Sequence, residues 1–243
     1  MPDINYHGPV VGFDLDDTLF PERDFCRSGF NFLCNPEKYK VLDITDYPSK
    51  ETLCALAREM DRELTSRRNP FDPFENFFEP LARTHNLEWD FRRHLEAYRA
   101  HVPNLSLTEE IKEVLNKLKD RGIAMAIVTD GRSVTQRCKI EALGLDEYVR
   151  PEMILISEET GHEKKESKEM FARIVRFYPE ASGFYYAGNN PLKDFYHPNL
   201  MGWTTIQVPP GEDDVHVGLQ PPSPLHAPGY KISKFLEIIN LIS

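Results

Sequence analysis

The stretch VVGFDLDDTLF, residues 10–20, places three aspartates directly after a short apolar run. The run is continuous rather than alternating, which is typical of a strand covered on both faces of a parallel sheet. Asp14 and Asp16 are two residues apart, so at a strand end their side chains face the same opening, while Asp17 points elsewhere. In a doubly wound sheet that opening is the carboxyl edge, where ligands bind. Two carboxylates so close repel each other unless a cation lies between them or one keeps a proton.

Two plainer readings of the acidic stretch compete with a reactive site. A calcium-binding loop needs glycine at its sixth position and glutamate at its twelfth, where this chain has Leu19 and Phe25, so that reading is excluded. An acidic turn in solvent is the other reading. Three acids at the end of the most apolar strand favour a reactive site over a solvated turn.

Apolar runs of the same kind recur along the chain and alternate with helical patterns. The predicted strands are residues 10–15, 124–130, 153–157, 183–188 and 203–208. The predicted helices between and after them are residues 108–122, 133–144, 167–179 and 231–243, the first with Thr108 as N-cap. Strands that alternate with helices predict an α/β fold, a doubly wound parallel Rossmann-like sheet of about five strands.

The interval from about residue 21 to 105 interrupts this alternation, because it carries helical patterns and no convincing strand. We therefore predict a Rossmann-like core formed by residues 1–20 and 106–243, with a helical cap of residues 21–105 inserted after the first strand. The segment 209–230 is rich in proline and glycine and is predicted to be extended.

Four motifs in order along the chain resemble those of the haloacid dehalogenase superfamily. FDLDDTLF is similar to the first motif, D-x-D-x-[TV], and IVTDG to the second, a strand that ends in Thr or Ser. KESKEMF resembles the lysine segment K-P-x-P-x-x-F, and YYAGNNPLKDF resembles the last acidic motif, G-D-x-x-x-x-D. The resemblance implies a phosphatase-type hydrolase with a helical cap.

The resemblance also implies roles for the aligned residues. Asp14 would be the nucleophile that forms an aspartyl phosphate. Asp16 would be the general acid and base that protonates the leaving oxygen and then activates water. Thr129 and the main-chain N–H groups of Asp130 and Gly131 would hold the phosphoryl oxygens.

A lysine would neutralise the phosphoryl charge. Aligning KESKEMF to the family pattern places Lys165 in this role, with Lys164 as the alternative. Glu166 and Lys168 stand where the family commonly has prolines.

The resemblance further implies Mg²⁺ as cofactor, since a cation offsets the repulsion between a carboxylate and a phosphate. Its ligands would be the Asp14 carboxylate, the Asp16 carbonyl and the last motif, which here offers Asn189 and Asp194. Asn189 departs from the pattern, because the family usually has aspartate at that position.

Asp16 argues for phosphoryl transfer, because dehalogenases of this superfamily keep the first aspartate of the motif and lack the second. The predicted function is hydrolysis of a small phosphorylated metabolite, with water as the final acceptor. A phosphomutase is one alternative. Another alternative is a protein with the same fold but weak catalysis, which binds a phosphate ligand or has a regulatory role. Asn189 is the residue that favours this alternative.

The overall composition limits the partners and the compartment that we expect. Acidic residues outnumber basic ones by 39 to 29, and a net charge of -10 disfavours nucleic acid or an anionic membrane as partner. The chain has no apolar segment of membrane-spanning length and no signal-peptide pattern at residues 1–10, so a cytoplasmic location is predicted. Its four scattered cysteines form no C-x-x-C pair and are expected to be reduced.

Overall fold

The computed structural model describes residues 2–33, 35, 51, 54–55, 58–59, 62, 91–211 and 218–242. By its contacts the chain divides into two compact units. The first unit comprises Met1–Pro21, Ser106–Glu212 and His216–Ser243, and the second comprises Glu22–Leu105 with Asp213–Val215. The predicted division into core and helical cap stays a prediction, because most of the second unit lies outside the described residues.

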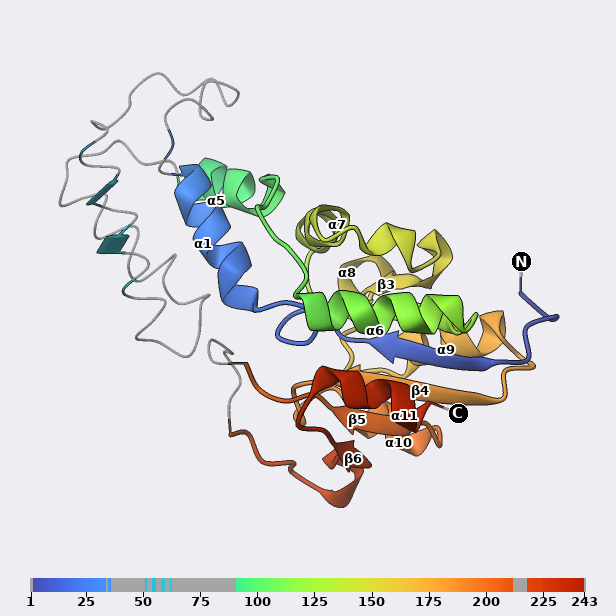
Figure 1. Ribbon diagram of the computed structural model, residues 1–243. Helices are drawn as coiled ribbons and strands as arrows, with labels where there is room; N and C mark the ends of the chain where they lie inside the picture. The colour runs from blue at the N-terminus through green and yellow to red at the C-terminus, as the bar shows by residue number, and fades with distance from the viewer. Residues whose placement is uncertain are drawn as a thin grey trace. The chain divides into compact units, whose positions relative to one another are not determined.

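The first unit is built around one parallel sheet (Figure 1). Its strands are β1 (Pro9–Phe13), β2 (Ala124–Thr129), β3 (Ile154–Ile156), β4 (Gly183–Gly188), β5 (Thr204–Gln207) and β6 (Tyr230–Lys231). They lie in the order β3-β2-β1-β4-β5-β6, so β1 is flanked by β2 and β4, and the strand order reverses beside it. Ligands bind at such a reversal in open α/β sheets, at the carboxyl ends of the strands.

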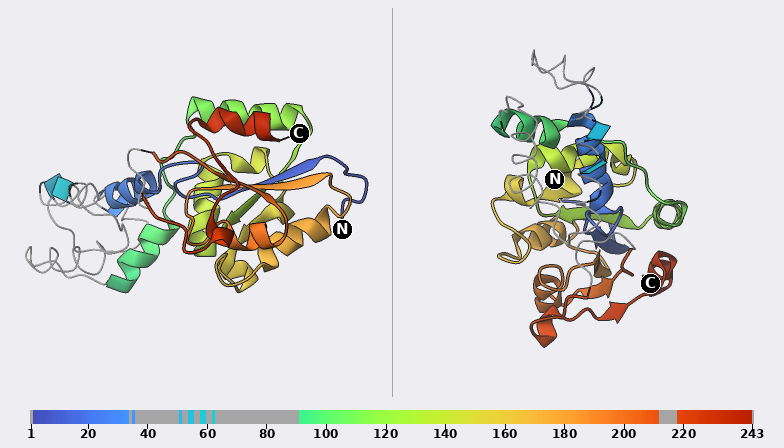
Figure 2. Two further views of the ribbon diagram at one scale, coloured as in Figure 1. Left: turned by 90° about the horizontal axis from the view of Figure 1, so that it is seen from below. Right: turned by 90° about the vertical axis from the view of Figure 1, so that its left-hand side faces the viewer.

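Helices cover both faces of this sheet. The helices of the first unit are α6 (Glu109–Asp120), α7 (Ser133–Ala142), α8 (Ser157–Thr160), α9 (Glu169–Phe177), α10 (Tyr196–Leu200) and α11 (Ile238–Leu241). Short 3₁₀ turns lie at Leu145–Glu147, Pro151–Met153, Pro224–His226 and Phe235–Glu237. Figure 2 shows α6 and α11 on one face and α9 and α10 on the other. The predicted Rossmann-like α/β fold is therefore confirmed.

Apolar side chains bury β1 from both sides. Val10, Val11 and Phe13 are at most 1% exposed, which explains why the sequence shows a continuous apolar run there. Gly12 lies between them, and a Cβ atom at that position would come within 3.1 Å of the Tyr186 ring on β4. The close approach of β4 therefore accounts for a glycine within a buried strand.

The start of α6 follows the sequence signals closely. The Thr108 side chain accepts a hydrogen bond from the N–H of Ile111 at 3.3 Å, as an N-cap does. Ile111, Val114, Leu115 and Leu118 are buried along one stripe of the helix. Gly122 follows the helix with φ of 68°, a left-handed conformation that glycine adopts without steric cost.

All five predicted strands are present, and β6 was not predicted. Both residues of β6 are exposed, so no apolar run marks this strand in the sequence. The predicted C-terminal helix is shorter than expected, because a 3₁₀ turn precedes α11. None of the helices in the described part of the chain is long and apolar enough to cross a membrane.

In the second unit, the described helices α1 (Glu22–Leu33) and α5 (Phe91–Ala100) pack against each other. The Tyr98 ring lies 5.5 Å from the rings of both Phe25 and Phe30, measured between centroids. A Cβ atom on Gly29 would lie 2.3 Å from the Tyr98 ring, so the close packing of the two helices requires glycine there.

Candidate active site

Asp14 lies directly after β1 and is 4% exposed. Its main-chain N–H donates to the carbonyl of Ala187 on β4 at 2.9 Å, which fixes the residue at the carboxyl edge of the sheet. Its Oδ1 accepts a hydrogen bond from Nζ of Lys164 at 2.5 Å. Burial raises the pKa of Asp14 to about 7; the charge of Lys164 opposes this shift and the charge of Asp194 adds to it.

Lys164 is fully buried and links three groups through its ammonium. Besides Asp14, its Nζ donates to Oδ1 of Asp194 at 2.7 Å and to the hydroxyl of Tyr186 at 3.3 Å. These contacts match the three protons of an ammonium group. Burial opposes the charge of Lys164, but the two carboxylates outweigh it and hold its pKa well above the usual value.

The structure does not bring Lys165, the preferred lysine of the sequence alignment, to this cluster. The Lys165 side chain is 57% exposed and pairs with Glu163 at 3.0 Å. The N–H of Lys164 donates to Oδ1 of Asp130 at 2.8 Å, which ties the main chain of this lysine to the second motif. The structure thus places the alternative, Lys164, beside Asp14; which lysine contacts the phosphoryl group stays a prediction.

Asp16 contacts two side chains of α7 that the sequence analysis did not identify. Its Oδ1 accepts from Nζ of Lys139 at 2.7 Å, and its Oδ2 accepts from Nε2 of Gln136 at 2.9 Å. The chain turns sharply at the next residue, Asp17, which has φ of 53°. The N–H of Asp17 donates to the carbonyl of Phe20 at 2.9 Å, which closes the turn.

The second motif lies at the carboxyl end of β2, beside β1. Thr129 is 1% exposed, and its hydroxyl oxygen accepts from Nε2 of Gln136 at 2.6 Å. The N–H of Gly131 donates to the hydroxyl of Ser157 at 2.9 Å. The N–H of Gly131, expected to hold a phosphoryl oxygen, therefore has a partner within the protein.

The last motif follows β4. Asn189 is 7% exposed, and its Nδ2 is buried with no hydrogen-bond partner among the described residues. Asp194 is fully buried; its Oδ1 accepts from Lys164, and its Oδ2 accepts from the N–H of Asn190 at 2.7 Å. Asp194 thus holds Lys164 and the loop after β4, whereas Asn189 presents an unused polar group.

The donor set at this edge fits a hard divalent cation that prefers oxygen ligands. The described residues hold no group of three or more His, Cys, Asp or Glu side chains that could bind a metal ion. Carboxylate, amide and main-chain oxygens would therefore have to share the ligation. Asp14 provides a carboxylate, and Asn189 carries an amide oxygen that could join it; the orphaned Nδ2 of Asn189 is a donor, which an acceptor such as a phosphate oxygen would satisfy.

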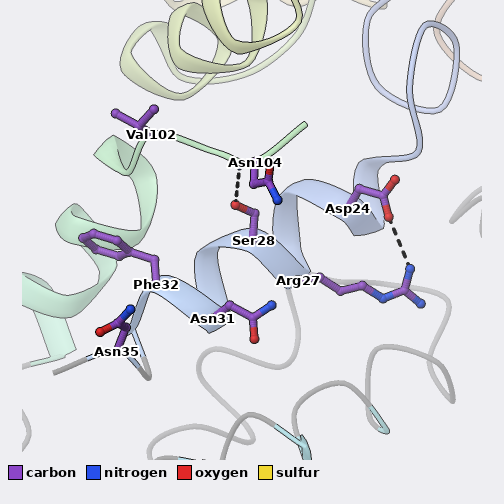
Figure 3. A pocket seen from close by; sticks show the side chains of 8 residues that line it. All are labelled: Asp24, Arg27, Ser28, Asn31, Phe32, Asn35, Val102 and Asn104. Atoms are coloured by element: carbon purple, nitrogen blue, oxygen red, sulfur yellow. Dashed lines mark hydrogen bonds and ion pairs between the residues drawn. The ribbon is translucent and has the colours of Figure 1, made fainter. Parts of the chain in front are cut away.

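A pocket of about 380 Å³ lies in the second unit. Figure 3 shows its lining, which comes from α1, from Asn35 just after it and from the segment after α5: Asp24, Arg27, Ser28, Asn31, Phe32, Asn35, Val102 and Asn104. Arg27 pairs with Asp24 at 3.3 Å, and Ser28 accepts from the N–H of Asn104 at 2.8 Å. Six of these eight side chains are polar, so the pocket suits a ligand with hydroxyl or charged groups.

Comparison with known proteins agrees with this geometry. A family model described as haloacid dehalogenase-like hydrolase matches residues 9–182. The chain is 28% identical over 221 residues to a ribulose-1,5-bisphosphate 5-phosphatase of Halopiger xanaduensis, covering 84% of this chain and 86% of that protein. It is 24% identical over 249 residues to a glyceraldehyde 3-phosphate phosphatase of Methanopyrus kandleri, covering 96% of each.

Solved structures share the fold. The magnesium-bound HAD-hydrolase YfnB from Bacillus subtilis has a TM-score of 0.61 at 19% identity and covers 98% of this chain and 99% of its own. A HAD phosphatase from Thermococcus onnurineus has a TM-score of 0.53, also at 19% identity, and covers 97% of this chain and 98% of its own.

Proposed function

Because the chain belongs to the haloacid dehalogenase-like hydrolase family, we propose that it is a phosphatase that acts on a small phosphorylated metabolite. Its relatives at 28% and 24% identity are named as phosphatases. The observation that carries the proposal is the pair of aspartates at the end of β1. Asp14 lies against the ammonium of Lys164, and Asp16 lies among donors of α7. Displacement at phosphorus needs a nucleophile and a separate proton donor for the leaving oxygen, and this pair supplies both.

In the proposed reaction, Oδ2 of Asp14 attacks the phosphorus atom, and the bond from phosphorus to the ester oxygen breaks. Asp16 gives its proton to that oxygen, so the alcohol leaves neutral. A water molecule then attacks the phosphorus of the aspartyl phosphate and gives its proton to Asp16. This second displacement releases inorganic phosphate and restores Asp14. Lys164 balances the charge of Asp14 throughout.

We assign the contacts with the phosphoryl oxygens to the Thr129 hydroxyl, the Asp130 N–H and Lys164. The burial of Thr129 and Lys164 at the carboxyl edge supports this assignment. The N–H of Gly131 is left out of the set, because Ser157 already accepts it. Hydrogen bonds to a buried phosphoryl group stabilise the charge that develops in the transition state.

We propose Mg²⁺ as the cofactor, held by the Asp14 carboxylate, the Asp16 carbonyl and the Asn189 amide. When bound, Mg²⁺ would offset the repulsion between the nucleophile and the phosphate. Asp194 is not assigned as a direct ligand, because both of its oxygens already accept hydrogen bonds from the protein. Its proposed role is to hold Lys164 in place.

We propose residues 21–105 as the element that determines substrate specificity. Within this segment, the polar pocket beside α1 offers groups that bind hydroxyl or charged substituents. The named relatives act on a ribulose bisphosphate and on glyceraldehyde 3-phosphate. Short-chain sugar phosphates are therefore the first substrates to test.

The deciding experiment measures phosphate release from a panel of phosphorylated metabolites and from 4-nitrophenyl phosphate, with and without Mg²⁺. The wild-type protein is expected to turn over at least one sugar phosphate with a Mg²⁺ requirement. Asp14→Asn should abolish turnover, because an amide does not form the acyl phosphate. Asp146→Asn, the same change on an exposed 3₁₀ turn, is the matched control and should retain activity.

Two outcomes would contradict the proposal. Full activity in correctly folded Asp14→Asn would contradict the assignment of Asp14 as the nucleophile. Tight binding of phosphate esters by the wild-type protein without any turnover would favour the alternative of a binding or regulatory protein.

A further inference from the structure

The buried residues of α7 are mostly polar. Its buried residues are Gln136, Lys139 and Ile140, so two of the three carry polar groups. Gln136 is 1% exposed and Lys139 is 3% exposed, whereas Val134 on the same helix is 46% exposed. Burial of an amide and an ammonium is costly unless specific partners satisfy them.

The partners of these two side chains belong to the candidate site. Lys139 reaches Oδ1 of Asp16 at 2.7 Å, and Gln136 reaches Oδ2 at 2.9 Å. Both oxygens of the carboxylate are thus held from one helix. The same Nε2 of Gln136 also reaches the Thr129 hydroxyl at 2.6 Å, so this amide bridges the first and second motifs.

Lys139 also contacts the far end of the turn that begins at Asp16. Its Nζ lies 5.8 Å from the centroid of the Phe20 ring, within the range of a cation–π contact. Asp16 and Phe20 are joined by a main-chain bridge. One side chain of α7 therefore contacts both ends of the turn that carries the proposed acid.

The geometry points to Lys139 and Gln136 as positioning residues that hold the Asp16 carboxylate in the orientation for proton exchange with the leaving oxygen. This inference rests on the proposed phosphatase reaction, in which Asp16 is the acid and base. Neither residue touches the reacting atoms in this role. Gln136 additionally fixes the position of the Asp16 carboxylate relative to the Thr129 hydroxyl, which is the proposed contact for a phosphoryl oxygen.

A purely structural role explains these residues poorly. A buried ion pair contributes little net stability compared with apolar side chains of similar volume. The same helix carries an ordinary surface pair, Arg137 with Glu159 at 2.7 Å, where neither partner is buried. Lys139 is instead buried, while its partner Asp16 keeps 20% of its side chain exposed. The pair therefore holds in place a carboxylate that solvent can still reach.

The test is a double-mutant cycle measured on two aryl esters, phenyl phosphate and 4-nitrophenyl phosphate. Lys139→Met keeps the length of the side chain and removes its charge. It should lower kcat on phenyl phosphate by roughly 10- to 100-fold, as small misplacements of a catalytic group do, and lower it less on 4-nitrophenyl phosphate. KM should change little, because the acid acts on the transition state and not on substrate binding.

The decisive measurement is the same substitution made in Asp16→Asn. If Lys139 acts through Asp16, Lys139→Met should cost almost nothing in that background. Equal losses in both backgrounds, or equal losses on both esters, would overturn the positioning role. Lys139→Gln, which also removes the charge, is carried through the same cycle, so the test does not depend on one variant folding.

Two further variants complete the design. Lys139→Arg retains the charge and should restore most of the activity on phenyl phosphate. Arg137→Met removes the surface pair of the same helix and should leave both esters unaffected. If the wild-type protein releases phosphate from no ester, the metabolite panel included, the proposed function falls and this inference with it; an active enzyme with additive losses overturns this inference alone.

Discussion

A lysine between two buried carboxylates has a different electrostatic role from a lysine on the surface beside it. Lys164 balances Asp14 and Asp194 inside the protein, whereas Lys165 pairs with Glu163 in solvent. The lysine motif could not distinguish them, because the two are adjacent and the usual prolines of the motif are missing. Only the folded chain distinguishes them, since the ammonium of Lys164 reaches both carboxylates and that of Lys165 does not.

We therefore expect Lys164→Met to lower kcat/KM by at least about 100-fold, since it removes the charge that we propose to contact the phosphoryl group. Lys165→Met, the same change one residue later, should stay within about twofold of the wild-type protein. Steady-state kinetics on 4-nitrophenyl phosphate, with circular dichroism as the check on folding, compares the two. Similar losses in both variants would contradict the assignment of Lys164.

Asp14 also makes the stability of the metal-free protein depend on pH. Its pKa is about 7 in the folded state and 3.8 in an ordinary environment, so the folded protein holds a proton that the unfolded chain releases. The stability from this group is complete below about pH 4 and is lost as the pH rises through about 7. An asparagine at position 14 does not titrate, so its contribution to stability would not depend on pH.

Relative to the wild-type protein, Asp14→Asn should therefore gain stability as the pH rises from 4 to 8, because only the wild-type protein loses a stabilising proton over this range. Urea unfolding in the presence of a chelator, at pH 4, 6 and 8, measures this difference. Asp146→Asn should show no comparable trend. A difference that does not change with pH would contradict the shifted pKa of Asp14.

At the scale of elements, how well the sequence predicts a segment depends on its burial. The strands β1 to β5 are predicted because their residues are buried in continuous runs, and α6 because its apolar stripe and Thr108 cap agree. The helix α7 is predicted, but its functional face is not, because glutamine and lysine on a helix are typical of a solvent-exposed surface. The sequence signal that could have indicated a polar buried face is the scarcity of apolar residues along residues 133–144.

The pocket beside α1 gives a prediction at the same scale. Asn31→Ala removes one hydrogen-bonding group from its lining and should raise KM for a sugar phosphate by roughly tenfold, as the loss of one hydrogen bond does. Its kcat/KM for 4-nitrophenyl phosphate should not change, because this ester has no hydroxyl groups to contact the pocket. Asn116→Ala, on the surface of α6, is the control. Equal effects on both substrates would argue against a role in specificity.

At the scale of the whole molecule, the fold follows from the sequence more completely than the site does. The motifs place Asp14, Asp16, Thr129 and Asn189 at neighbouring strand ends, as the order of the strands requires. The contacts of Lys139 and Ser157 come from elements distant in sequence from their partners, and no short motif describes them.

Metal binding should be visible in the thermal stability of the whole protein. Mg²⁺ is expected to raise Tm of the wild-type protein, because a ligand that binds only the folded state stabilises it. Asn189→Asp adds a negative charge to the proposed site and should lower the Mg²⁺ concentration for half the Tm shift, by roughly tenfold if the charge is worth about 1.4 kcal/mol. Without Mg²⁺ this variant should melt earlier than the wild-type protein, since its added charge is buried near Asp14 and Asp194.

Asn116→Asp adds the same charge on the exposed face of α6 and should change neither value. An unaltered Mg²⁺ dependence in Asn189→Asp would place the ion away from position 189.

The place of β1 at the centre of the sheet has a consequence for the newly made chain. β1 is synthesised first, yet its neighbours β2 and β4 begin only at Ala124 and Gly183. At typical rates of translation the first of these leaves the ribosome roughly 5 to 20 seconds later. During that interval an uncovered, strongly apolar strand has no partner in its own sheet. The protein should therefore depend on chaperones during its synthesis more than an enzyme whose central strand is made last.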